Sequence, residues 1–200
     1  GLPPNQPVHF QAGQFVDFLL DGGVRRSYSI ATAPKAQGVR QLEFHIRHLP
    51  GGHFTPHVFS NMKVRDLLQI EMPLGSFYLK EDSVGPMILL ASGTGFAPIK
   101  SILTTLAERN SLRSIHLYWG GRQKQDLYDM EFVESLGSKL KNFEFIPVLS
   151  DALPSDKWSG RTGFVHRAVM QDFPDMSSIE VYACGAPIVV ESARADFIEQ

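Results

Sequence analysis

The chain has 200 residues, 43% hydrophobic and 20% charged, a composition typical of one large or two small globular domains and unlike that of a disordered chain. Its 19 lysine and arginine residues are balanced by 21 aspartate and glutamate residues, so the net charge of −2 argues against nucleic acid or anionic lipid as a partner. The single cysteine excludes an internal disulfide. It also excludes an iron–sulfur cluster held by these residues alone, because such clusters need about four thiolates.

Hydropathy gives no sign of a membrane or export segment. No apolar run approaches the roughly 18 residues that span a bilayer, and the first residues lack the basic start of a signal peptide. We therefore expect no membrane span and a cytoplasmic location.

The first part of the chain has the pattern of β-strands. Between residues 14 and 72 apolar residues alternate with polar ones, as at Val16, Phe18 and Leu20, which is the period of half-buried strands. Turn-forming clusters separate short strands at residues 21–23, 33–35, 49–52 and 73–75. Short antiparallel strands of this kind close into barrels, so we predict a small antiparallel β-barrel domain over residues 1–83.

The pattern changes after the polar segment 81–86. Residues 87–91 form a continuous apolar run, which is typical of a strand buried on both faces. Strand and helix patterns then alternate, with strands at 115–119, 143–149 and 179–184 and helices near 99–106, 130–140, 165–170 and 188–198. This alternation predicts a doubly wound parallel α/β domain over residues 84–200.

The first candidate site is the run Arg26-Ser27-Tyr28-Ser29 at the end of a predicted strand. Alternation along a strand puts Arg26 and Tyr28 on one side, where a guanidinium and an aromatic ring suit a flat ring joined to a phosphate. The alternative is a surface arginine beside an ordinary strand tyrosine.

A second candidate is the loop Gly51-Gly52-His53-Phe54-Thr55, which follows a predicted strand over residues 41–47. Two glycines before a hydroxyl residue let backbone N–H groups approach an anion, although a plain hairpin loop fits equally. Four histidines crowd this stretch, at positions 45, 48, 53 and 57. We disfavour a metal site there, because the first two face opposite ways on a strand and Pro56 breaks any helix carrying the other two.

The loop from Ser92 to Pro98 joins the first buried strand to the first helix. Its glycine-rich N–H groups and the positive helix end suit a diphosphate, although an ordinary strand–helix turn is the alternative. It departs from the common dehydrogenase fingerprint, which would place a third glycine at Pro98 and an acidic residue after the second strand. An ordinary flavin-free dehydrogenase is therefore disfavoured.

Cys184 ends the last predicted strand and precedes Gly185. The carboxyl edge of such a sheet is where ligands bind, so Cys184 is a candidate site residue. A buried structural thiol is the alternative.

In combination these segments resemble the ferredoxin-NADP⁺ reductase family, in its bacterial branch of oxygenase and dehydrase reductases. The resemblance extends from about residue 14 to residue 198. It rests on motifs in family order at residues 26–29, 51–55, 73–77, 93–98, 118–128 and 184–185.

The resemblance implies bound FAD, with FMN less favoured, and NADH or NADPH as substrate. The implied flavin contacts are Arg26 for a phosphate, Tyr28 and Ser29 for the ring, His45, Ile46 and Arg47 for the ribityl and phosphate path, and Gly52 and Thr55 for the pyrophosphate. For the nicotinamide nucleotide they are Gly93, Thr94, Gly95 and Pro98 at the pyrophosphate, Thr94 and Cys184 at the pyridine ring, and Arg122, Asp126 and Tyr128 at the adenosine. Gly185 is a further implied cofactor contact. Ser29, Tyr28 and Cys184 are the implied catalytic residues. Strand alternation puts Ser29 opposite Tyr28, so the strand must bend or end between them.

The implied function is a flavoprotein that takes hydride from NAD(P)H and passes electrons singly to an iron–sulfur or haem partner. That partner could be a ferredoxin domain on the same, longer chain. We expect a longer natural protein, because the opening barrel strands and the terminal segment of the family have no match here. Two alternatives stay open: a free-flavin reductase, which residues 118–128 resemble, and a non-enzymatic nucleotide-responsive module.

Overall fold

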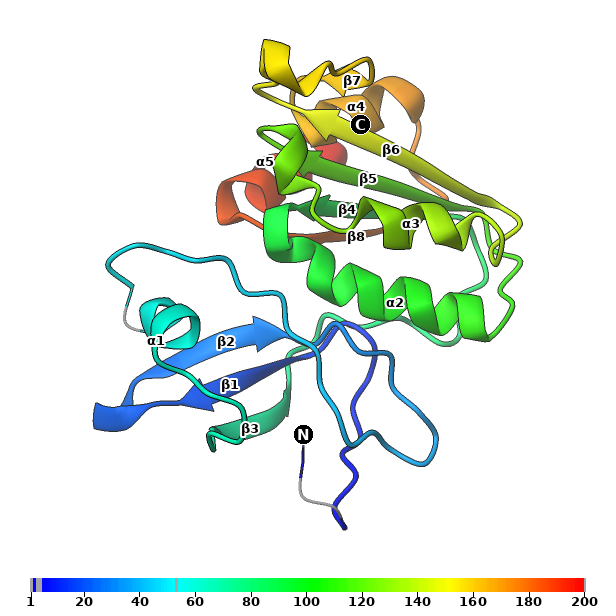
Figure 1. Ribbon diagram of the computed structural model, residues 1–200. Helices are drawn as coiled ribbons and strands as arrows, with labels where there is room; N and C mark the ends of the chain where they lie inside the picture. The colour runs from blue at the N-terminus through cyan, green and yellow to red at the C-terminus, as the bar shows by residue number, and fades with distance from the viewer. Residues whose placement is uncertain (1, 3–4, 53, 200) are drawn as a thin grey trace.

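The computed structural model describes residue 2 and residues 5–52 and 54–199, and its strands form two separate sheets (Figure 1). The first sheet is antiparallel in the order β2-β1-β3. Its strands are β1 (Phe15–Leu19), β2 (Arg25–Ser29) and β3 (Gln69–Leu74). The second sheet is parallel in the order β7-β6-β5-β4-β8.

One face of the first sheet forms a small core. Val16 and Phe18 of β1 are 0% and 4% exposed, and they pair in register with Tyr28 and Arg26 of β2. Paired residues of an antiparallel ladder share a face, so Arg26 and Tyr28 lie on the core side. The Phe18 ring contacts both Tyr28, at 5.6 Å between centroids, and Phe54, at 5.2 Å. The short helix α1 (Thr55–Ser60), which the sequence did not predict, follows Phe54.

Only part of the expected barrel is built from regular strands. Among the described residues outside the three strands of the first sheet, single antiparallel bridges join Val8 to Val39 and Ile30 to Phe44. The predicted strand over residues 41–47 is wrong, because this segment is extended but has only the bridge at Phe44. Its polar groups bond elsewhere, as the Glu43 N–H donates to the Thr32 hydroxyl and the His45 ring contacts the second part of the chain.

The parallel sheet consists of β4 (Met87–Ser92), β5 (Ile115–Gly121), β6 (Phe143–Leu149), β7 (Arg161–Thr162) and β8 (Glu180–Cys184). Helices α2 (Phe96–Glu108) and α3 (Met130–Leu136) cover one face, and α4 (Val165–Asp172) and α5 (Pro187–Ile198) cover the other (Figure 1). The prediction of antiparallel β-structure followed by a doubly wound parallel domain is confirmed.

The burial of the central strand β4 explains the continuous apolar run over residues 87–91. Met87 and Leu89 pack into the hydrophobic cluster under α2, whereas Ile88 and Leu90 pack into the cluster under α4 and α5. All four side chains are 0% exposed. A strand with helices on both faces has no solvent side, so its sequence loses the alternation that a half-buried strand shows.

The described residues contain no helix long and apolar enough to cross a lipid bilayer.

Candidate functional site

The carboxyl edge of the parallel sheet brings two predicted segments together. After β4 the chain makes a tight turn over Gly93–Gly95 and enters α2, and next to it β8 ends at Cys184. A Cβ added to Gly95 would lie 2.3 Å from the Cys184 carbonyl oxygen, and one added to Gly185 would lie 2.6 Å from the Ser92 carbonyl oxygen. Because neither position has room for a side chain, the turn after β4 lies directly against the end of β8.

Aromatic side chains pack against the core side of this turn. The Trp119 indole N–H donates to the Gly93 carbonyl oxygen at 3.2 Å. Phe96, the first residue of α2, stacks on Trp119 with 4.0 Å between ring centroids. Both rings are fully buried, so the turn is fixed from the core side while Thr94 lines a pocket.

Two neighbouring cavities open at this edge. The larger, about 700 Å³, is lined by strand ends such as Gly93 and Arg122 and by the first turn of α4. The smaller, about 340 Å³, is lined by Thr94 and Tyr128 and by residues 45–47. Arg47, Gly93 and Asp126 line both cavities, so the two form one cleft. Since residues 45–47 come from the first part of the chain, this cleft lies between the two sheets.

Arg26, Tyr28 and Ser29 lie at the end of β2, in the first part of the chain. Arg25 points the other way and forms ion pairs with Glu71 and Asp17. Within the described residues no carboxylate pairs with Arg26, whose guanidinium donates to the Arg25 carbonyl oxygen at 2.7 Å. Arg26 therefore keeps donors for an anion. β2 includes Ser29, which pairs in register with Phe15, so the strand neither bends nor ends between Tyr28 and Ser29 as the implied role of Ser29 required.

Thr55 closes the loop that precedes α1. Its hydroxyl accepts a hydrogen bond from the Leu49 N–H and donates one to the Leu49 carbonyl oxygen, both at 3.0 Å, and the Gly52 N–H donates to the same oxygen. The side chain of Thr55 thus shapes the loop and has no hydrogen left to donate to a phosphate. His53, within this predicted motif, lies outside the described residues.

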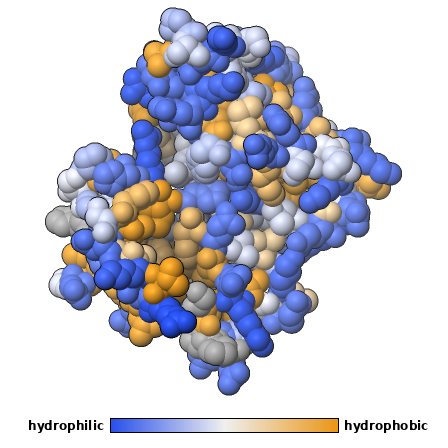
Figure 2. All heavy atoms as spheres, viewed as in Figure 1, coloured by the Kyte–Doolittle hydropathy of each residue, from blue (hydrophilic) through white to orange (hydrophobic). Residues whose placement is uncertain are grey.

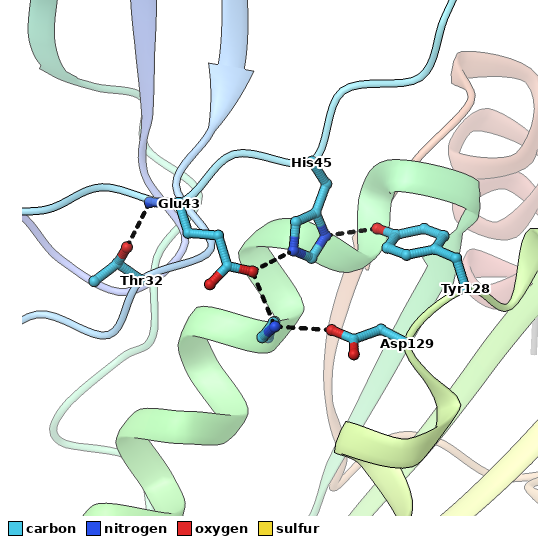
Figure 3. Close-up of polar contacts among 6 residues, drawn as sticks. Thr32, Glu43, His45, Tyr128 and Asp129 are labelled. Atoms are coloured by element: carbon cyan, nitrogen blue, oxygen red, sulfur yellow. Dashed lines mark hydrogen bonds and ion pairs between the residues drawn. The ribbon is translucent and has the colours of Figure 1, made fainter. Parts of the chain in front are cut away.

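The structure brings His45 and Tyr128, predicted for different cofactors, into contact with each other (Figure 3). His45 Nε2 lies 2.9 Å from a Glu43 oxygen, and Nδ1 lies 2.6 Å from the Tyr128 hydroxyl. A carboxylate only accepts, so Nε2 carries the hydrogen and, in the neutral ring, Nδ1 accepts from Tyr128. Both ring nitrogens of His45 are therefore bonded within the protein, and Tyr128 lines the smaller cavity together with Asp126.

Lys100, which the sequence analysis missed, joins the same group of side chains. Its ammonium lies 2.9 Å from Glu43 and 2.8 Å from Asp129 (Figure 3). Burial acts to raise the pKa of Glu43, but hydrogen bonds from Lys100 and His45 outweigh it and lower that pKa. Burial acts to lower the pKa of Lys100, but the bonds to Asp129 and Glu43 raise it. The sequence signal that could have identified Lys100 is its position one residue after Ile99, a buried residue of α2.

The predicted adenosine residues Arg122 and Asp126 have separate tasks. The Asp126 carboxylate accepts from the backbone N–H groups of Arg122 and Gln123, at 2.9 and 3.0 Å, and so holds the turn after β5. The Arg122 side chain is 75% exposed at the cavity and pairs with Asp151 at 3.0 Å. The exposed Arg122 side chain is accessible to a ligand in the cavity, whereas the Asp126 carboxylate is already bonded to two backbone N–H groups.

The far end of the larger cavity contains two polar residues that sequence reasoning missed. His166 of α4 and Asp196 of α5 both line it, and His166 Nδ1 and Asp196 Oδ2 are buried without a hydrogen-bond partner among the described residues. Asp196 Oδ2 lies 3.2 Å from His166 Nε2 and from Arg167 Nη2, without the alignment of a hydrogen bond. Burial lowers the pKa of His166. The sequence signal that could have identified His166 is its position among the buried residues of α4.

Family models match both parts of the chain. The model for the oxidoreductase FAD-binding domain matches residues 1–78, and the model for the oxidoreductase NAD-binding domain matches residues 89–195. The chain belongs to this family of FAD- and NAD-binding oxidoreductases. It has an FAD-binding domain followed by an NAD-binding domain, and the predicted order and cofactors are confirmed.

Named relatives agree with this assignment. The chain is 41% identical over 197 residues to the CDP-6-deoxy-L-threo-D-glycero-4-hexulose-3-dehydrase reductase of Yersinia pestis, covering 98% of this chain and 58% of that protein. It is 38% identical over 196 residues to terephthalate 1,2-dioxygenase reductase component 1 of Comamonas sp, covering 96% and 56%. The chain thus spans little more than half the length of these curated relatives.

Solved structures show the same fold. The Amycolatopsis reductase GcoB has a TM-score of 0.87 and 36% sequence identity, covering 98% of this chain and 59% of that one. A Neisseria gonorrhoeae ferredoxin NADP⁺ reductase with bound FAD and NADP has a TM-score of 0.78, 21% identity, and coverage of 99% and 82%. The second likeness concerns the fold alone.

Gly95→Ala tests the close approach at the sheet edge. The added Cβ meets backbone that cannot rotate away, so we expect a loss of about 1 to 3 kcal/mol in the free energy of unfolding. Gly85→Ala is the matched control, because its Cβ would meet only the Ser178 carbonyl oxygen, at 3.9 Å. Denaturant unfolding measures both variants, and equal stabilities would contradict the described approach.

The alkylation of Cys184 tests its environment. Burial raises the pKa of this thiol from 9.0 to about 11, so the thiol is neutral at physiological pH. We expect the iodoacetamide reaction rate to keep rising with pH toward about 11, with Cys184→Ala as the blank and circular dichroism monitoring the fold. A plateau reached by pH 9.0 would show an exposed thiol instead.

Proposed function

We propose that the protein is an NAD(P)H-dependent, FAD-containing reductase that takes electrons in pairs from a nicotinamide nucleotide and passes them singly to an iron–sulfur or haem acceptor. The observation that carries this proposal is the cleft in which Arg47 of the FAD-binding domain and Thr94 of the NAD-binding domain line the same cavity. A cleft lined by both domains allows two cofactor rings to meet away from bulk water.

The residues of the first domain fit FAD. Among the described residues no carboxylate pairs with the Arg26 guanidinium, which lies on the same face as the Tyr28 ring and suits a phosphate joined to an aromatic ring. Since the Thr55 hydroxyl is already used, the pyrophosphate contacts would come from backbone N–H groups of the loop over residues 49–52. Bound FAD would supply the redox chemistry, because it accepts a pair of electrons and releases them one at a time.

The residues of the second domain fit the nicotinamide nucleotide. The N–H groups of the turn over Gly93–Gly95 and the positive end of the 13-residue helix α2 favour a pyrophosphate. Cys184 lies beside this turn with a neutral, mostly buried thiol. In this proposal Cys184 and Thr94 orient the pyridine ring and keep water from it, while Gly185 allows the ring close to the backbone.

The acceptor and the rest of the chain form part of the proposal. A solved phthalate dioxygenase reductase, 20% identical with a TM-score of 0.71, has a title that names electron transfer from pyridine nucleotides to [2Fe-2S]. With one cysteine here, a cluster would need residues beyond these 200, such as a ferredoxin domain on the same longer chain. The free thiol of Cys184 supports a reducing, cytoplasmic location.

A hydrophobic surface on the FAD-binding domain supports a protein partner. Figure 2 shows hydrophobic side chains gathered and the surface hollowed over the region of α1 and the first sheet. Among the described residues the large exposed hydrophobic side chains between positions 49 and 68 are Leu49, Phe59, Val64, Leu67 and Leu68. An exposed apolar patch of this kind often marks a contact surface.

We also place the domain boundary between residues 83 and 84, in the gap between the two family matches.

The direct test of this function is the visible spectrum of the full-length protein. We expect it to stay yellow after desalting, because the phosphate contacts retain FAD, and to lose its flavin absorbance when NADH or NADPH is added without oxygen. Loss of the colour on desalting would favour a free-flavin reductase. A retained flavin that neither nucleotide reduces would contradict the proposed function.

Arg26→Ala tests the flavin-binding role. Removing a charge-assisted hydrogen bond costs about 1.5 to 3 kcal/mol, so we expect FAD to bind about one to two orders of magnitude more weakly. Arg25→Ala is the matched control, because Arg25 points to the other face and pairs with Glu71. Titration of the flavin-free protein with FAD measures both, and an Arg26→Ala affinity equal to that of the control would refute the assignment.

A further inference from the structure

One linked group of polar side chains joins the two domains beside the cleft. We call it the interdomain clasp: Glu43, His45, Lys100, Tyr128 and Asp129. The first two belong to the FAD-binding domain and the other three to the NAD-binding domain. Figure 3 shows the side chains converging from the extended segment 43–45, the first turns of α2 and the loop before α3.

Burial and shared partners separate the clasp from ordinary surface ion pairs. The side chains of His45, Lys100 and Asp129 are 8%, 16% and 26% exposed. Glu43 bonds to both His45 and Lys100, and Lys100 bonds to both Glu43 and Asp129. The Glu43 side chain is 52% exposed, but its two bonds are linked through Lys100 to Asp129. Linked bonds of this kind hold one geometry better than isolated pairs do.

A second set of bonds ties the same segments together. Ser101, the neighbour of Lys100, donates to the Thr32 carbonyl oxygen at 2.7 Å, and the Thr32 hydroxyl accepts from the Glu43 N–H at 2.8 Å. The first turns of α2 therefore hold the FAD-binding domain at Thr32 as well as at Glu43.

The clasp stands next to the proposed reaction cleft on both sides. Lys100 comes six residues after Thr94, on the helix that the Gly93–Gly95 turn begins. Glu43 and His45 lie in the segment that leads to Arg47, and His45 and Tyr128 themselves line the smaller cavity. The clasp therefore joins the segment that leads to Arg47 on one wall to the helix that follows Thr94 on the other.

We propose that Lys100 is a positioning residue, which holds Glu43 and Asp129 together and thereby fixes the width of the cleft between the two cofactor-binding domains. The mechanical part of the proposal concerns the clasp alone, and its effect on the reaction rests on the proposed function. Lys100 touches neither of the cavities lined by the proposed cofactor residues, so it acts through the position of other side chains.

The test compares Lys100→Met with Lys35→Met in the full-length protein. Lys35 forms another ion pair between the domains, with Glu108 at the far end of α2, and among the described residues neither side chain has a second partner. Two quantities are measured: hydrogen–deuterium exchange over residues 41–47, which needs no redox activity, and the anaerobic rate of flavin reduction at saturating NADH.

We expect Lys100→Met to speed exchange at the Glu43 amide at least about tenfold and to slow flavin reduction by about one to two orders of magnitude, because small misplacements of reacting groups are costly. FAD content and the KM for NADH should change little, and Lys100→Arg should restore most of the rate. Lys35→Met should change neither quantity. Glu43→Gln, which keeps the shape of the side chain, should shift both quantities in the same direction as Lys100→Met.

Unchanged exchange in both Lys100→Met and Glu43→Gln would overturn the clasp, as would equal effects from Lys35→Met. Faster exchange with an unchanged rate of flavin reduction would overturn the positioning role. If NADH fails to reduce the wild-type flavin, the proposed function fails, while the exchange measurements still decide whether the clasp holds the domains.

Discussion

The geometry of the site depends on a close approach between two backbone segments, the turn over Gly93–Gly95 and the end of β8. Neither Gly95 nor Gly185 has space for a Cβ, because each faces backbone atoms of the other segment. This contact sets Gly95 against Cys184 at the carboxyl edge of the sheet. The buried Phe96 and Trp119 rings keep the turn from moving into the core. The turn is therefore packed against the sheet on one side and against the end of β8 on the other.

This edge alone gives only half of the proposed site. The other half comes from the FAD-binding domain, whose Arg47 reaches the same cavities as Gly93. The two halves work together only if their separation is fixed, and the polar contacts around Lys100 and Glu43 supply a physical reason why it is. The protein thus supplies position, while the redox chemistry belongs to the cofactors.

The sequence predicted those parts of the fold that follow from burial and local conformation. The uninterrupted apolar run of β4 indicated a strand buried on both faces, and the glycines at positions 93 and 95 indicated a tight turn before a helix. Both features are determined by neighbouring residues, so a single sequence contains them. The strand expected over residues 41–47 was wrong. Its apolar residues pack against the core of the first sheet, while Glu43 and His45 bond to Lys100 and Tyr128, so the alternation arises without ladder partners.

Contacts between residues far apart in the sequence also explain why the surroundings of some site residues were unexpected. Nothing near His45 in the sequence indicates that Tyr128, far along the chain, bonds to its ring, and nothing near Thr55 shows that its hydroxyl is used by Leu49. Lys100 was missed because a lysine on an amphipathic helix is ordinarily solvent-exposed. Long-range polar pairing is decided by how the two domains pack, and that packing leaves no periodic pattern in the sequence.

The most direct measurement for the central claim is a crystal structure of the full-length protein with FAD and oxidised nicotinamide nucleotide bound. The account predicts the flavin phosphates at Arg26 and the loop over residues 49–52, with the flavin and pyridine rings facing each other in the cleft beside Thr94 and Cys184. A flavin ring lying outside that cleft, with Arg26 in contact only with solvent, would contradict it.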